Sequence, residues 1–214
     1  RYLAHVKQRQ ALELIPAWTD EFRSIFGRES GGLVRGYRLE DAETVVVALG
    51  SVLGTIKDTI DEMREQGARI GVLGITCFRP WPATAVRDAL AGAKRVVVLE
   101  KSLAVGMGGI VSNNVSASWA GSPDLVHTVI AGLGGRAITR RSLHKVFAEA
   151  MEGRLEPLTF MDLDYAMVNR VLDRERELRD ESDALLARLP FDALDVLVAG
   201  LQSWKFLWGS MAMG

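Results

Sequence analysis

Short runs of consecutive apolar, β-branched residues alternate with stretches of helical spacing between residues 41 and 153. The clearest run, 44–49 (TVVVAL), has the pattern of a strand buried on both faces. The stretch 52–66 that follows carries its large apolar residues on one helical stripe. Such alternation across short loops indicates an α/β fold with a mostly parallel sheet and helices on both faces. Further strands are expected at 69–76, 95–99 and 125–131, and further helices at 82–91, 111–119 and 139–153.

The residues on either side of this alternation have other patterns. Apolar residues recur at helical spacing over 11–26, interrupted by Pro16, and no strand-like run occurs in the first forty residues. Dense charges of both signs over 173–183 predict a solvated helix. We therefore expect a helical arm and linker over 1–40, an α/β domain over 41–165 and a helical tail over 166–214.

The end of the tail, 194–213, is apolar but contains Asp195, Gln202 and Lys205. A membrane span needs about twenty residues with few or no charges, so we expect no span here. An amphipathic helix that docks on a partner, or on the domain itself, fits better. Trp204 and Trp208 are four residues apart and would face the same way, either as anchors on a partner or as part of this chain's own core.

Composition narrows the possible functions. Twenty-six basic residues balance 27 acidic ones, so no basic excess points to nucleic acid. One cysteine excludes an internal disulfide framework and a multi-cysteine metal or iron–sulfur site within this chain. Three histidines leave little for a metal cluster, and we predict no metal ligands. No cleavable signal peptide is visible, which favours the cytoplasm, and the start at Arg1 suggests a piece of a longer protein.

In parallel α/β sheets, ligands and partners meet the carboxyl ends of the strands. These ends are predicted to carry Gly50, Ser51, Arg79 and Arg136 in glycine-rich loops. Arginine suits a carboxylate or phosphate, and glycine permits close approach of a backbone. We therefore predict these four as cofactor-binding, ligand-edge or interface residues.

Each of these assignments has a simpler structural alternative. In these alternatives, Gly50 and Ser51 form only a turn with a helix cap, Arg79 only pairs with a nearby carboxylate, and Arg136 only satisfies carbonyls of its own loop. The pair Glu100-Lys101 can be read as a plain surface ion pair.

Several motifs fall short of a catalytic assignment. The run 106–111 (GMGGIV) lacks the third glycine of a dinucleotide motif, and 132–135 (GLGG) lacks the Lys-Ser/Thr of a P-loop. His127 lies in a strand, which is typical of a core or interface histidine, and Cys77 is expected to be a buried bystander. No Ser/His/Asp assembly can be argued, so no catalytic residue is predicted.

A family resemblance adds to this reading. The run TVVVALGSVLGTIKDTIDEMREQGARIGVLGITCFRPWP resembles the C-terminal part of the alpha chain of pyruvate:ferredoxin oxidoreductases and related 2-oxoacid:ferredoxin oxidoreductases. RVVVLEKSLAVGMGG and VIAGLGGRAIT are similar to the next two motifs of that family, and FRSIFGRESGGLVRGYRLEDAE is similar to its preceding hinge. The resemblance covers about residues 11–164 and implies a transketolase C-terminal-like sheet.

The resemblance also implies a reaction, the oxidative decarboxylation of a 2-oxoacid to its acyl-CoA with electrons passed to ferredoxin or flavodoxin. The family uses thiamine diphosphate with magnesium, iron–sulfur clusters and coenzyme A. The diphosphate motif GDG is missing here and Cys77 stands alone, so these cofactors would be held by other subunits or domains of the complex. The chain would be a domain or split subunit that supports the active site and is inactive in isolation.

Two other classes of function remain open. One is the C-terminal domain of another thiamine-dependent enzyme, of transketolase or 2-oxoacid dehydrogenase type, although AGLGGR followed by Thr139 argues against it. The other is a free-standing anion- or nucleotide-binding module that uses Arg79 and Arg136.

Overall fold

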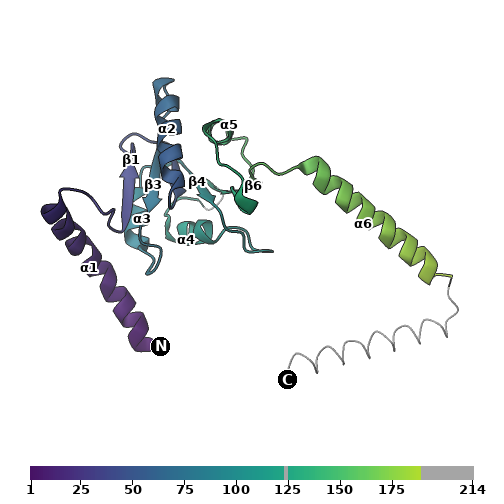
Figure 1. The fold of residues 1–214 in the computed structure, drawn as a ribbon, viewed down its shortest axis with the longest axis horizontal. Helices are drawn as coiled ribbons and strands as arrows, with labels where there is room; N and C mark the ends of the chain where they lie inside the picture. The colour runs from purple at the N-terminus through teal and green to yellow at the C-terminus, as the bar shows by residue number, and fades with distance from the viewer. Residues whose placement is uncertain (123–124, 189–214) are drawn as a thin grey trace. The chain divides into compact units, whose positions relative to one another are not determined.

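The computed structural model describes residues 1–122 and 125–188 of the chain (Figure 1). It divides into two compact units, Arg1–Asp162 and Leu163–Gly214. The apolar stretch 194–213, with Trp204 and Trp208, lies outside the described residues. The division into an arm, a domain and a tail at residues 40 and 165 stays a prediction.

One six-stranded sheet lies in the first unit, in the order β1-β3-β2-β4-β5-β6. Strands β2 to β6 are parallel to their neighbours, and only β1 is antiparallel, against β3. The strands are β1 (Val34–Tyr37), β2 (Thr44–Ala48), β3 (Ile70–Ile75), β4 (Arg95–Glu100), β5 (Val126–Ile130) and β6 (Leu158–Phe160). The helices of this unit are α1 (Tyr2–Phe26), α2 (Val52–Glu65), α3 (Ala83–Ala89), α4 (Ile110–Ser118) and α5 (Arg140–Met151).

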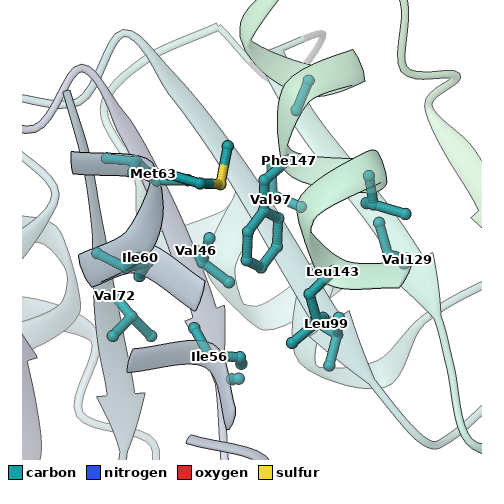
Figure 2. Close-up of a cluster of buried hydrophobic side chains, with 14 of the residues drawn as sticks. Val46, Ile56, Ile60, Met63, Val72, Val97, Leu99, Val129, Leu143 and Phe147 are labelled. Atoms are coloured by element: carbon teal, nitrogen blue, oxygen red, sulfur yellow. The ribbon is translucent and has the colours of Figure 1, made fainter. Parts of the chain in front are cut away.

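Helices cover both faces of the sheet, as the sequence predicts. Because side chains alternate along a strand, Val46 and Val97 face one side, where α2 and α5 pack. Figure 2 shows Phe147 of α5 and Met63 of α2 gathered over this face. On the other side Val47 packs with residues of α3 and α4. All five residues of β2 are buried, which explains the apolar run that follows Thr44.

The two edge strands were not predicted. The expectation of no strand in the first forty residues is wrong, because Val34–Tyr37 pairs with β3 as an antiparallel edge. This strand, VRGY, is only half buried and contains Gly36, so it lacks the apolar signature of the central strands. Strand β6 has three residues and extends the sheet beyond residue 153, where the predicted alternation stopped.

The predicted interruption at Pro16 is also wrong, because α1 continues through it as one helix. The predicted cap of α5 is confirmed: the side chain of Thr139 accepts from the backbone N–H of Ser142 and completes a capping box. In the second unit, the charged stretch 173–183 lies within α6 (Tyr165–Leu186), as predicted. None of the described helices is both long and apolar enough to span a bilayer.

Candidate functional site at the carboxyl edge of the sheet

The strand order places a topological switch point between β2 and β4. From β2 the chain passes to β3 on one side, and from β3 it crosses over β2 to β4 on the other. The helices that follow β2 and β4 cover opposite faces of the sheet, α2 on one and α4 on the other. In open α/β sheets, the crevice outside the carboxyl ends of two such strands is the usual ligand position.

Gly50 and Ser51 lie at this switch point. Gly50 has a φ of 79°, which glycine adopts without strain, and turns the chain from β2 into α2. Ser51 occupies the cap position of α2, but its side chain caps no backbone N–H. Both residues are exposed, so the hydroxyl of Ser51 is accessible and is not used as a cap of the helix.

Arg79 lies one strand further out, after β3. Its guanidinium is exposed, stacks 4.0 Å from the ring centroid of Phe78 and donates to the carbonyl of Phe78 at 2.7 Å. The carboxylate partner considered for this arginine is not among its contacts in the described residues. Its charge therefore remains available to an anion or a partner.

Arg136 lies on the other side of the switch point, after β5. Its guanidinium donates to the backbone carbonyl of Asp162, just before the second unit begins. All four predicted residues thus share one edge of the sheet, in the spatial order Arg79, Gly50-Ser51, Arg136. No hydrogen bond joins any of these four residues to another. Their role in binding a cofactor, a ligand or a partner stays a prediction.

Glu100 has a different role at this edge from the one that its sequence context suggests. The reading of Glu100 and Lys101 as a surface ion pair is wrong, because Glu100 is only 3% exposed. Its carboxylate accepts from the backbone N–H groups of Ile110, Val111 and Ser112 at 2.8–3.1 Å, and from the hydroxyl of Ser102 at 3.0 Å. These N–H groups form the first turn of α4, where a helix needs acceptors and favours a negative charge.

We call this arrangement the Glu100 clasp: Glu100, Ser102 and the first turn of α4. It explains Gly109, the last glycine of the run 106–109. A Cβ on Gly109 would lie 2.0 Å from a carboxylate oxygen of Glu100, so only glycine fits there. In the dinucleotide-like motif, Gly109 therefore packs against the buried carboxylate of Glu100. An acidic residue that ends an apolar strand before a glycine-rich helix start is the sequence signal that could have indicated it.

The other polar residues noted in the sequence have structural roles. His127 is 9% exposed and its ring nitrogen lies 3.4 Å from the carbonyl of Glu156, consistent with a core histidine. In the described residues, no three His, Cys, Asp or Glu side chains gather in a metal-binding group.

Cys77 is half-buried, and its thiol lies 3.3 Å from the carbonyl of Pro80. Burial raises the pKa of the Cys77 thiol. Since the thiolate is the reactive form, a raised pKa means less thiolate at neutral pH. We expect alkylation by iodoacetamide at pH 7 to be slower in the folded chain than in urea, with a folded-state rate profile shifted to higher pH. Equal rates at pH 7 would contradict this.

The fold and the edge define a class of protein, the open and mostly parallel α/β domains. In this chain, the loops at the carboxyl ends of the strands, around the switch point, are rich in glycine and carry exposed arginines. Residues 42–143 match the family described as pyruvate:ferredoxin oxidoreductase core domain II. Core domain II of this family is therefore present in residues 42–143 of the chain.

Individual relatives agree with the family match. Pyruvate synthase subunit PorA of Methanosarcina barkeri is 39% identical over 172 residues, which is 76% of this chain and 42% of the relative. The corresponding subunit of Methanothermobacter thermautotrophicus is 37% identical over 146 residues, 68% of this chain and 37% of the relative. The chain thus spans about two fifths of the length of these curated relatives.

A solved structure of 2-oxoglutarate:ferredoxin oxidoreductase from Magnetococcus marinus, with 2-oxoglutarate, coenzyme A and succinyl-CoA bound, is also similar. The identity is 17% and the TM-score 0.45, over 61% of this chain and 21% of that one.

Proposed function

We propose that this chain is a domain or split subunit of a thiamine-diphosphate-dependent 2-oxoacid:ferredoxin oxidoreductase, which converts pyruvate or a related 2-oxoacid to its acyl-CoA. The observation that carries the proposal is the core domain II match over residues 42–143, which spans β2 to β5 and their carboxyl-end loops. The 39% identity to a pyruvate synthase subunit supports it.

The role proposed for this chain is to support an active site formed with other chains or domains. An iron–sulfur cluster takes about four thiolates, and the whole chain has one cysteine. The described residues also offer no carboxylate and histidine group for a magnesium ion. The residues present therefore do not fit the clusters or the metal, and no chemical step is assigned to them. What the chain offers is an edge for contact with substrate, coenzyme or a neighbouring subunit.

Reconstitution tests this proposal. The chain would be coproduced with partner chains that carry clustered cysteines and a GDG…N motif, and pyruvate- and coenzyme A-dependent reduction of ferredoxin would be measured. We expect activity with all chains present, none with this chain alone, and none when it is omitted. Pyruvate oxidation by this chain alone, or full activity without it, would overturn the proposal.

Replacement of Arg79 by alanine tests the edge itself. The exposed guanidinium contacts only its own loop, so the free energy of unfolding should change by no more than about 0.5 kcal/mol. Loss of one charged hydrogen bond to an anion or partner should lower the activity of the assembled complex about tenfold.

The matched control is Arg69→Ala. Arg69 is an exposed arginine just before β3, at the opposite edge of the sheet, where it pairs with Glu43. We expect this variant to retain the activity of the complex. Equal activity losses in the two variants, or an Arg79→Ala loss of stability that matches its loss of activity, would place Arg79 among purely structural residues.

A further inference from the structure

The loop after β5 has a backbone conformation that concentrates N–H groups on one side. Gly132 has φ 71° and ψ 15°, and Gly134 has φ 65° and ψ 22°, both left-handed. Leu133 between them keeps the right-handed conformation of a short 3-10 turn. Alternation of left- and right-handed residues turns successive N–H groups toward a common concavity, a backbone nest that suits an anion.

These N–H groups have no acceptor of their own. In the part of the chain that the structure describes, the amides of Gly132, Leu133 and Gly134 donate to no backbone or side-chain group. Before and after this loop, the amide of Ala131 donates to the carbonyl of Glu100, and the amide of Arg136 donates to that of Leu133.

A cation lies beside the nest. A Cβ placed on Gly132 would be 3.1 Å from Cε of Lys101, so the lysine side chain extends along this loop. Within residues 1–122 and 125–188, no carboxylate lies within ion-pair distance of its ammonium. The adjacent Glu100 carboxylate does not neutralise Lys101, because it is held in the Glu100 clasp.

The nest is also accessible. Gly134 is exposed, and no atom lies within 4 Å of the position that its Cβ would take. Three amide donors, one ammonium and no side chain over the tip leave room for an oxyanion to approach the backbone.

We propose that Lys101 and the amides of Gly132, Leu133 and Gly134 form a binding site for the phosphate group of a small molecule. A phosphate offers several acceptor oxygens in different directions and up to two negative charges, which matches several amides plus an ammonium better than a single carboxylate does. The identity of the physiological ligand rests on the proposed function, because the site lies at the same sheet edge as the predicted ligand-binding residues. Phosphate binding by the chain alone does not depend on it.

Titration of the 15N-labelled chain with inorganic phosphate at constant ionic strength tests the site, with acetate as a parallel probe. We expect saturable shifts of the amide resonances of Gly132, Leu133 and Gly134 with phosphate, and at least tenfold weaker binding of acetate. Shifts that do not saturate, that spread evenly over the surface, or that are stronger with acetate would overturn the proposal.

Two variants separate the lysine from the nest. Lys101→Met removes the charge and Gly134→Ala penalises the left-handed φ, and each should weaken phosphate binding about tenfold, equal to 1.4 kcal/mol. The control is Gly67→Ala, at a glycine of φ 89° with equally open surroundings after α2. It imposes a similar backbone penalty outside the nest and should leave phosphate binding unchanged. Equal weakening in all three variants would contradict a site at this loop.

The result of the phosphate titration can be told apart from the result of the reconstitution. If phosphate binding fails while the reconstituted complex remains active, only the nest proposal falls. If phosphate binds as expected while reconstitution gives no activity, the site stands and the enzymatic assignment falls.

Discussion

Replacement of Glu100 by alanine is expected to lower the free energy of unfolding by about 3–5 kcal/mol. The carboxylate is 3% exposed and accepts four hydrogen bonds, three of them from the first turn of α4. Alanine would leave these donors without their charged acceptor in a region that water reaches poorly. Since Glu100 also ends β4, the change would separate the start of α4 from the central sheet.

Urea unfolding followed by circular dichroism measures this effect. Glu100→Gln keeps one acceptor oxygen but turns an amide N–H₂ toward the donors, so we expect a loss of about half the alanine value. Glu152→Ala is the matched control, because Glu152 is an exposed glutamate paired only with Arg154, and it should cost less than about 1 kcal/mol. A Glu100→Ala loss no larger than that of Glu152→Ala would show that the clasp contributes little.

Replacement of Phe147 by alanine is expected to cost about 3–5 kcal/mol of unfolding free energy. Phe147 is fully buried between α5 and the sheet, in the layer it shares with Val97 and Met63 (Figure 2). Removal of the ring takes away its contacts with both layers and leaves a cavity that rigid strands cannot close.

The matched control is Phe26→Ala, because Phe26 is 61% exposed near the end of α1. It packs mainly on Phe22 in the same helix, with ring centroids 4.7 Å apart, so its loss should be below about 1 kcal/mol. Both variants are compared by their urea midpoints. Similar shifts in the two would mean that the layer beneath α5 is loosely packed.

The central strands and their helices could be predicted because their sequences report burial directly. TVVVA in β2 is buried throughout and apolar after Thr44, since both of its faces are covered. The edge strands could not be predicted in the same way. In β1, VRGY is only half buried, and its pairing is specified by a long-range contact with β3 rather than by a local pattern.

Part of the candidate site could also be predicted from the sequence, and part could not. The position of Gly50, Ser51, Arg79 and Arg136 at one sheet edge follows from strand order alone, which the α/β alternation indicates. The Glu100 clasp could not be read off in that way, because it depends on a carboxylate meeting amides ten to twelve residues later. The nest likewise depends on the φ and ψ of successive glycines, which their residue type permits but does not require.

The strand order has a consequence for the chain during its synthesis. Strand β2 is made before both of its sheet neighbours, β3 and β4, and β4 follows only after α2, β3 and α3. At translation rates of about 5–20 residues per second, one side of this mostly apolar strand stays unpaired for several seconds. A nascent chain of this topology is exposed to aggregation during that interval, and chaperone binding near residues 44–48 would protect it.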